Sequence, residues 1–426
     1  MAGLSNIQKH LLAIFLISAI AAIVYSNSFD CSFHFDDQQA IVENYAIHRF
    51  DLKEIFSTSS RPILELTFAI NYYFGKLNVF GYHLVNLLLH ISNGIMLYLI
   101  ILWTAALPSI KEKYQERSYR IALYASLIFI AHPIQTQAVT YIISRSSVLA
   151  TTFYLLAFVL FIRAESGEQR AESRNQRSEV RGRKARNSTL KAQSSKLMAP
   201  RSSLYALCST LYAPRSMLLA AAFLACCLGM GTKQIVATLP LMLLIYDFFF
   251  LSDGDFKGLK RRYLFHLAMF STMAVTIYLS AASLQKFVSF DYAKGIDMPF
   301  GESVTSFQYF MTQLHVIPYY IKLLFIPTNL NLDYDWPITM HLDLTTVLFF
   351  ILLSSIASIS IWTYRKARLV SFAIAWFFIT LSVTSSFVVI YDVIFEHRLY
   401  LPSIGFALLI AVMISRISML KFGRTT

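Results

Sequence analysis

Charged residues are scarce in this sequence of 426 residues: Asp, Glu, Lys and Arg make up 14% of it, whereas 56% are hydrophobic. A soluble protein of this length has no core large enough to hide so much apolar surface. The sequence therefore predicts an all-α, polytopic integral membrane protein, because helices satisfy their own backbone hydrogen bonds inside lipid.

Signatures built on cysteine and glycine are also missing. The four cysteines, Cys31, Cys208, Cys226 and Cys227, show neither the spacing of a metal site nor a disulfide framework. The sequence has no P-loop and no Gly-rich dinucleotide turn, so nothing indicates a nucleotide site. No small-residue cleavage site follows the first apolar run, 11–25, which we expect to be a retained helix rather than a signal peptide.

Apolar windows of about 20 residues predict about ten membrane spans. They cover residues 9–27, 83–107, 119–137, 146–163, 216–231, 234–251, 263–284, 343–363, 369–390 and 399–416. The apolar region 306–328 contains Pro318 and Pro327, and we expect it to lie at the outer interface without crossing. The expected architecture is one domain, 1–426, with 10–12 transmembrane helices, an outer loop 28–82 that carries the acidic motif, and an outer loop 285–342 with interfacial or re-entrant helices.

The basic residues predict the orientation of the chain. With a cytoplasmic N-terminus, the inner segments hold 27 of the 37 Lys and Arg residues but only 9 of the 24 acidic ones. This is the positive-inside pattern, so the net charge of +13 reports topology and predicts no nucleic-acid partner. We expect both termini in the cytoplasm, and Asp36 and Asp37 on the periplasmic or lumenal side of an inner membrane or endoplasmic reticulum.

The longest inner segment, 164–215, is rich in Ser and Arg and lacks periodicity over most of its length. Such a composition predicts a solvated, largely disordered cytoplasmic loop near anionic headgroups.

Polar side chains collect at the outer ends of the spans, whereas the span centres hold almost no charge. Ionisable groups near a bilayer are costly, so they are functional candidates. One span carries four polar residues at a spacing that places them on one helix face: His83, Asn86, His90 and Asn93. This polar face suits either a substrate cavity or hydrogen bonding between helices. The remaining candidates are the acidic pair Asp36 and Asp37, Arg61, His132, Arg145, Lys233, Asp392, Glu396, His397 and Arg398.

Together these residues predict an outer cavity in which cations face carboxylates. Arg binds phosphate well because its planar fork can bond two oxygens. A carboxylate within hydrogen-bond reach can deprotonate a hydroxyl. The alternative for the acidic pair is a helix N-cap, and for each basic residue it is an anchor that reaches to the interface.

Five stretches resemble, in order, the membrane portion of the transmembrane and tetratricopeptide-repeat O-mannosyltransferases. They are "FHFDDQQAIVEN", "SRPILELTFAINYYFG…GYHLVNLLLH", "HPIQTQAVTYIISRSSVLATTFYLLAF", "GMGTKQIVATLPLMLLIYDF" and "EHRLYLPSIGFALL". The resemblance implies a GT-C-like bundle and a glycosyltransferase that takes a sugar, with inversion, from a polyprenyl-phosphate donor (undecaprenyl or dolichyl). It implies that Asp36 or Asp37 is the catalytic base and that Arg398 binds the donor phosphate.

Charge and position indicate roles for the other polar residues of the predicted cavity. Arg61, Arg145, Lys233 and His397 are expected to help bind the donor phosphate; the substrate cavity is expected to include His83, Asn86, His90, His132 and Glu396. No protein ligands for a metal are identified and no cofactor is expected, although the carboxylates could hold Mg²⁺ or Mn²⁺.

The sequence departs from the family pattern in two ways. No tetratricopeptide repeats occur within the 426 residues, which leaves the acceptor open. Gln234 stands where relatives often have Glu, which argues against a role for an acid at that position. The expected acceptor is a Ser or Thr hydroxyl of an exported protein. A glycan or lipid acceptor is the alternative within the enzyme class, and a flippase for lipid-linked sugars is the alternative outside it.

Overall fold

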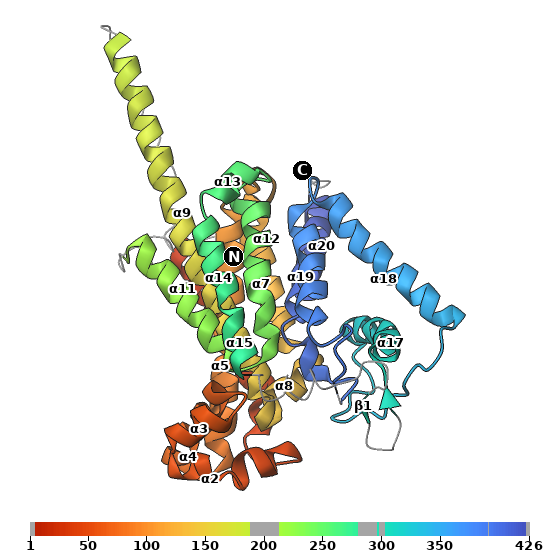
Figure 1. Cartoon of the computed structure of the whole chain (residues 1–426). Coiled ribbons are helices and arrows are strands. Elements are labelled where there is room, and N and C mark those ends of the chain that lie inside the picture. The colour runs from red at the N-terminus through yellow and green to blue at the C-terminus, as the bar shows by residue number, and fades with distance from the viewer. Residues whose placement is uncertain (1–4, 188–212, 280–295, 298–302, 391, 423–426) are drawn as a thin grey trace.

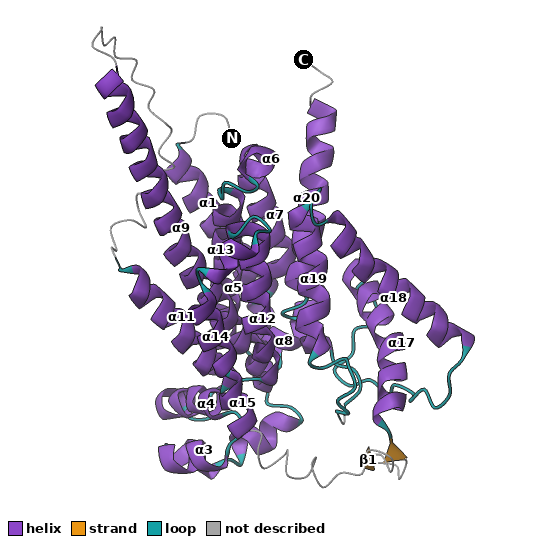
Figure 2. Cartoon of the chain, turned by 45° about the horizontal axis from the view of Figure 1, so that its top comes forward, coloured by secondary structure: helices purple, strands orange, loops and turns teal. Residues whose placement is uncertain are grey.

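Ten helical segments form a bundle in the part of the chain that the computed structural model describes, residues 5–187, 213–279, 296–297, 303–390 and 392–422 (Figures 1 and 2). They coincide with the ten apolar windows of the sequence. Their bounds are α1 (Asn6–Val24), α5 (Val79–Ala105), α7 (Ser118–Ala131), α9 (Arg145–Asn187), α11 (Arg215–Met230), α12 (Leu239–Tyr246), the pair α14 (Tyr263–Ser271) and α15 (Met273–Leu279), α18 (Leu344–Thr363), α19 (Arg368–Ser382) and α20 (Ser403–Phe422).

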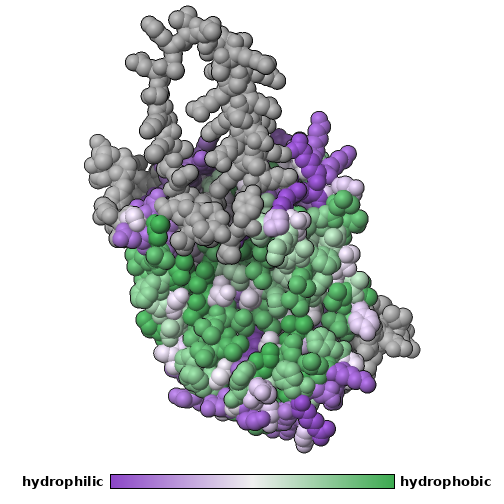
Figure 3. Space-filling model, turned by 90° about the vertical axis from the view of Figure 1, so that its left-hand side faces the viewer, coloured by the Kyte–Doolittle hydropathy of each residue, from purple (hydrophilic) through white to green (hydrophobic). Residues whose placement is uncertain are grey.

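Length and composition support a membrane location for this bundle. Among the described residues, five segments are long and apolar enough to cross a bilayer, and four more are shorter apolar helices. The five are Asn6–Val24, Val79–Ala105, Ile142–Ser166, Gln234–Leu251 and Leu344–Thr363. On the face seen in Figure 3, an apolar belt lies between two hydrophilic ends. The chain is therefore an all-α integral membrane protein, apart from the short pairing of β1 (Ile296–Asp297) with β2 (Ser303–Val304).

The two ends of the bundle carry different structures. One end holds α6 (Lys111–Tyr114) and α13 (Phe256–Lys260), both short and basic, and we call it the α6–α13 end (Figure 2). The opposite end, the α2–α4 end, holds α2 (Tyr45–Arg49), α3 (Leu52–Thr58) and α4 (Pro62–Gly75) (Figures 1 and 2).

Local sequence explains why the predicted outer loop 28–82 is mostly helical. The Asn44 side chain accepts hydrogen bonds from the first turn of α2, and the Asp51 side chain does the same for α3. α4 begins with Pro62, which suits a first helical position because proline lacks an N–H group. The π-helical turn η2 (Gln38–Val42) follows the acidic pair directly.

The second predicted outer loop, 285–342, contains α17 (Ser306–Phe325), which includes Pro318. α17 is seen nearly end-on in Figure 1, so it lies across the direction of the bundle helices. It packs against α18, and its buried Tyr320 hydroxyl donates to the Phe395 carbonyl (2.9 Å). Residues 285–295 and 298–302 of the predicted loop lie outside the described residues.

Helix α5 occupies the centre of the bundle, where it packs against α1, α7 and α9. α20 packs against α7 and α19. Gly405 permits the close approach of α19 and α20, because a Cβ atom there would collide with the Ala373 carbonyl oxygen. These contacts fix the ends of α9, α19 and α20, whose adjoining loops form the site described below.

The predicted disordered loop 164–215 differs from the structure in its first part. α9 continues as a helix through Asn187, and α11 begins at Arg215. Residues 188–212 lie outside the described residues.

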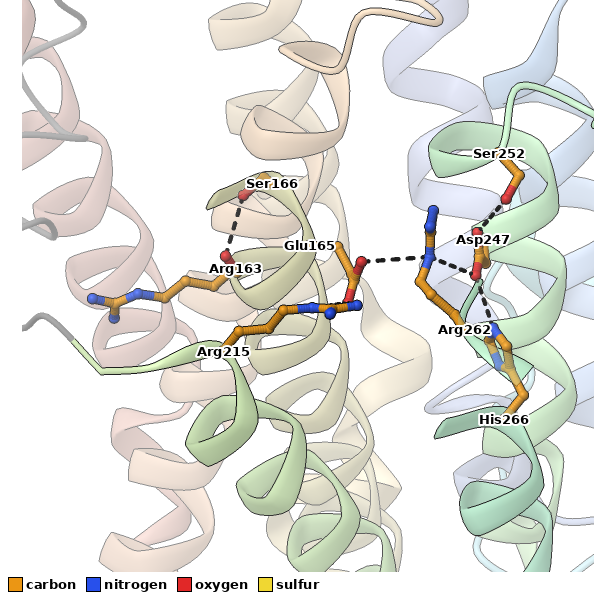
Figure 4. A network of polar contacts seen from close by, with 8 residues as sticks. All are labelled: Arg163, Glu165, Ser166, Arg215, Asp247, Ser252, Arg262 and His266. Atoms are coloured by element: carbon orange, nitrogen blue, oxygen red, sulfur yellow. Dashed lines mark hydrogen bonds and ion pairs between the residues drawn. The ribbon is translucent and has the colours of Figure 1, made fainter. Parts of the chain in front are cut away.

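A buried polar network joins the helices near the α6–α13 end (Figure 4). The Arg262 Nε atom lies 3.0 Å from the Asp247 carboxylate and 3.4 Å from that of Glu165. His266 Nε2 is 2.8 Å from Asp247, and Arg215 donates twice to Glu165 (2.8 and 3.0 Å). Three elements from distant parts of the sequence, α9, α11 and the 247–266 segment, are thus held together by charge pairs, which are buried except for the 40% exposed side chain of Arg215.

We predict that Arg262→Met destabilises the protein by about 3 kcal/mol, because it removes a cation shared by two buried carboxylates. Thermal unfolding in detergent measures this effect. Asp253→Asn is the control: Asp253 pairs with Arg368 but is mostly exposed, and exposed pairs contribute at most about 1 kcal/mol. Equal losses in the two variants would contradict a special role for the buried network.

Candidate functional site

A cavity of about 830 Å³ opens at the α2–α4 end of the bundle. Its lining comes from six segments that are distant in sequence, within 35–36, 60–61, 141–146, 233–235, 332–333 and 383–398. Most of these segments are loops or short turns at the ends of α4, α9, α12 and α19, where the bundle holds them in place. Six of the predicted site residues share this lining: Asp36, Arg61, Lys233, Asp392, His397 and Arg398.

The two adjacent carboxylates have different surroundings. Asp36 is exposed and lines the cavity, and its backbone N–H donates to the Tyr141 hydroxyl (3.0 Å). Asp37 is 1% exposed, and its carboxylate accepts hydrogen bonds from the backbone N–H groups of Ile143 (2.7 Å) and His34 (3.1 Å). Asp37 therefore fastens the acidic loop to the short helix η5 (Ile142–Ser144), and Asp36 is the carboxylate that faces the cavity.

Three basic side chains lie on the cavity wall. Arg61 is half-buried, whereas Lys233 is 9% exposed and Arg398 4% exposed. In the described part of the chain, none of the three forms an ion pair with a carboxylate. Because buried charges are costly without a partner, this wall is suited to an anion from outside the protein.

Protein groups hold two of these cations in place. The Arg398 guanidinium donates to the Val393 carbonyl (3.0 Å) and to the Asp392 carbonyl, and the Lys233 ammonium donates to the Ser147 hydroxyl (2.7 Å). Burial lowers the pKa of Lys233 well below its ordinary value, and the charges of Arg61 and Arg398 lower it further. Burial also lowers the pKa of Arg61, against the attraction of Asp36. A bound anion would relieve this mutual repulsion.

His397 lies in the same wall, and its imidazole ring is neutral. Its ring stacks on that of Phe395 (centroids 4.9 Å apart), and its backbone N–H donates to Gln137 (2.6 Å). Burial lowers the pKa of His397 far below its usual range, and the charges of Lys233 and Arg398 act in the same direction. At neutral pH, His397 therefore offers a hydrogen bond to an anion but no charge.

Glu396 points to a neighbouring loop. Its carboxylate accepts from the Asn331 backbone N–H (2.6 Å) and from the Tyr334 hydroxyl (2.5 Å). This clasp holds Leu332 and Asp333 in the cavity wall. Asp333 is not among the residues predicted from the sequence, where the acidic composition of 333–335 is the only signal that indicates it.

Arg145 does not line the cavity, which departs from the expected phosphate contact. Its side chain is fully buried and donates to Asn86 (2.6 Å), Asn71 (2.6 Å) and the Tyr82 carbonyl (2.9 Å). The guanidinium also lies over the Phe68 ring, 4.5 Å from its centroid. Because protein groups surround this guanidinium, it joins α4, α5 and α9 and leaves no face for a phosphate.

The polar stripe of α5 follows the alternative interpretation, hydrogen bonding between helices. His83, Asn86, His90 and Asn93 are all buried and lie outside the cavity lining. Asn86 donates to the Val139 carbonyl (3.2 Å), and His83 Nε2 bonds the Cys31 carbonyl (3.0 Å). His90 Nδ1 lies 2.6 Å from the Tyr400 hydroxyl, and Asn93 donates to that hydroxyl (3.1 Å).

His132 is also placed outside the cavity lining. Its Nε2 atom bonds the Leu324 carbonyl of α17 (2.9 Å), and its Nδ1 atom accepts from the Ile134 N–H (3.1 Å). His132 thus connects the end of α7 to the end of α17.

One part of the wall is apolar. Val383, Val388, Val389 and Ile390 contribute to it from the segment that follows α19, and Ile235 faces the cavity from the turn before α12. The cavity therefore combines cations, the exposed carboxylates of Asp36, Asp333 and Asp392, and an apolar surface. This combination suits an amphipathic ligand with an anionic group, placed beside a hydroxyl that a carboxylate can deprotonate. Among the described residues, no three His, Cys, Asp or Glu side chains gather as a metal site would require.

A bundle of apolar helices with a charged and partly apolar cavity at one end defines an integral membrane protein with a candidate site at that end. Comparison with known proteins specifies the relationship. Human protein O-mannosyl-transferase TMTC4 is 30% identical over 169 residues, which cover 35% of this chain and 22% of the relative. Human TMTC3 is 32% identical over 165 residues (35% and 17%), and Drosophila melanogaster Tmtc3 is 31% identical over 193 residues (38% and 20%).

These matches confirm the family resemblance: the chain is related to the TMTC protein O-mannosyl-transferases. The chain spans about a fifth of the length of these curated relatives. No family model matches the chain. No solved structure matches it either.

The buried Asp37 carboxyl predicts a specific pH dependence of stability. Burial raises its pKa to about 6, although its backbone donors favour the charged form. Because the folded state holds this proton more tightly than the unfolded state, the contribution of Asp37 to stability grows as the pH falls through 6.

We predict that the wild-type protein gains about 1 kcal/mol relative to Asp37→Asn when the pH is lowered from 7 to 5. Thermal unfolding of both proteins at each pH measures the difference. The variant lacks the titrating group and keeps one amide oxygen as an acceptor, so other pH effects cancel in the comparison. Parallel pH profiles for the two proteins would contradict the raised pKa.

Proposed function

We propose that this chain is a membrane glycosyltransferase that moves a sugar from a polyprenyl-phosphate donor to a hydroxyl acceptor, with inversion. The observation that carries the proposal is the cavity in which Arg61, Lys233 and Arg398 lie in the same lining as Asp36. The names of the relatives favour mannose as the sugar and a protein hydroxyl as the acceptor.

The three cations are assigned to the donor phosphate. The C1–O bond of a polyprenyl-phosphate sugar breaks with its electron pair moving to the phosphate oxygen. Cations that are already in place stabilise the charge that develops on that oxygen, and they do so more strongly in a poorly solvated site than in water. His397 contributes a neutral hydrogen bond, and no step of this mechanism requires a metal.

Asp36 is assigned as the general base. The acceptor oxygen attacks C1 on the face opposite the phosphate, forms the new C–O bond and gives its proton to the Asp36 carboxylate. The Tyr141 hydroxyl fixes the Asp36 backbone, and Asp37 fixes the turn, so the base is held in one position relative to the cations. This arrangement assigns different tasks to the two adjacent carboxylates.

The apolar wall of Val383, Val388, Val389 and Ile390 is assigned to the isoprenoid chain next to the phosphate. We place the α2–α4 end on the periplasmic or lumenal side and both termini in the cytoplasm, because the basic loops lie at the opposite end.

We predict that Asp36→Asn lowers turnover at least about 100-fold, because general-base catalysis contributes about that much or more. Purified protein in nanodiscs receives a short-chain polyprenyl-phosphate mannose and a peptide containing Ser and Thr, and mass spectrometry follows the hexose added to the peptide. Asp51→Asn, outside the cavity, is the matched control and retains wild-type turnover. Full activity of Asp36→Asn rejects the base assignment, and movement of lipid without any transfer identifies a flippase instead.

We predict that Arg398→Gln lowers kcat/KM for the donor about 100-fold, because the developing phosphate charge loses a positioned donor. The KM of the acceptor stays unchanged. Arg49→Gln is the control, because Arg49 is exposed and lies outside the cavity lining. Thermal unfolding verifies that each variant is folded, and an acceptor defect in Arg398→Gln would reject the phosphate assignment.

A further inference from the structure

Phe35 combines two unusual properties. Its backbone lies in the left-handed region (φ 45°), which bulky residues rarely adopt. Its side chain is 67% exposed and lines the cavity directly before Asp36. A large apolar ring that is mostly exposed, on a strained backbone, contributes little to the stability of the fold.

The surrounding hydrogen bonds impose this backbone conformation. The Gln38 N–H donates to the Phe35 carbonyl (3.1 Å), and the Asp37 N–H donates to the His34 carbonyl (3.0 Å). The contact of Asp36 with Tyr141 and those of Asp37 with Ile143 and His34 hold the same turn. Strain of this kind persists where the surroundings determine the conformation, and it is concentrated at functional sites.

Phe33 shows what an aromatic ring of this loop does when it serves the fold. It is half-buried and packs edge-on against Tyr82 (ring centroids 5.4 Å apart) within a core cluster of the α2–α4 end. Phe35 belongs to no such cluster in the described part of the chain, and no described aromatic ring pairs with it. The turn directs one ring into the protein and leaves the other in the cavity.

We propose that Phe35 is a specificity-determining residue that binds an apolar side chain of the acceptor peptide beside the reacting hydroxyl. This inference rests on the proposed function, in which Asp36 receives the acceptor proton. Because Phe35 directly precedes the base, its ring belongs to the acceptor side of the cavity. The donor side is defined by other segments, those of Lys233, Arg398 and the apolar wall 383–390.

A contact between the Phe35 ring and an apolar side chain of the acceptor is energetically favourable. The Phe35 ring offers a large apolar surface directly beside Asp36. When an apolar side chain of the acceptor covers this ring, apolar surface on the ring and on the side chain is buried. Such a contact is made equally in the bound acceptor and in the transition state, so it lowers the KM of the acceptor and leaves kcat unchanged.

The test compares two peptides that carry the same Ser or Thr acceptor, one with Leu and one with Gly as its neighbour. In nanodiscs, with saturating polyprenyl-phosphate mannose, the wild-type protein is expected to show a lower KM for the Leu peptide. Phe35→Ala is expected to raise that KM about 10-fold, to match the KM of the Gly peptide, and to leave kcat and the KM of the donor unchanged.

Two further substitutions separate contact from strain. Phe35→Gly relieves the left-handed backbone, yet it lacks the ring, so it is expected to show the same KM as Phe35→Ala with a higher thermal midpoint. Phe35→Tyr keeps the ring and is expected to retain the preference for Leu. Recovery of the wild-type KM by Phe35→Gly would show that strain, rather than contact, caused the effect and would overturn the proposal.

Phe74→Ala is the matched control, because Phe74 is an 83% exposed aromatic residue of α4 that lies outside the cavity lining. A KM shift in this variant as large as that of Phe35→Ala would indicate a general role of exposed aromatic rings and overturn the proposal. Equal KM values for both peptides in the wild-type protein would overturn it too, while transfer itself would leave the proposed function standing. Absence of any transfer by the wild-type protein would reject the proposed function, and this inference with it.

Discussion

The burial of the Arg145 guanidinium is the interaction on which the geometry of the site depends. This cation begins α9 and bonds Asn71 of α4, Asn86 and the Tyr82 carbonyl of α5, so it locks the short helices of the α2–α4 end onto the bundle. A guanidinium can satisfy several acceptors at once through its planar fork, which no other side chain reproduces. The acidic turn lies next to this anchor, because Asp37 bonds the backbone of Ile143, two residues before Arg145.

The acidic pair shows a second constraint: one carboxylate stabilises the turn, and this leaves its neighbour in the cavity. Asp37 is buried and bonded by backbone N–H groups, whereas Asp36 is exposed in the cavity. The basic side is arranged similarly. Arg398 and Lys233 each use one part of their donor capacity on protein groups, and both lack a carboxylate partner within the described residues. The protein thus keeps positive charge in a poorly solvated place, which costs stability and prepares the site for an anion.

Much of the fold could be predicted from the sequence, because a membrane span has a strong signal in length and apolarity. The ten windows coincide with helical segments for this reason. The sequence also indicated Asp36, Arg61, Lys233, His397 and Arg398, since polar residues at span ends are few. It could not separate Asp36 from Asp37, or Arg145 from the other cations, because burial and partners depend on how distant segments meet. Asp333 was missed because its position depends on the clasp formed by Glu396, 63 residues further along the chain.

The ion pair between Glu165 and Arg215 has a consequence for how this protein can vary. It joins the last turn of the apolar part of α9 to the first residue of α11, at the base of the intervening 49-residue insertion. Because the two helices are fastened at this point, the free-energy cost of closing the intervening chain depends only weakly on its length. A change in the length of this segment is therefore expected to leave the shape of the cavity at the far end of the bundle unchanged. The ion pair thus separates a segment whose length can change from the part of the bundle that carries the cavity.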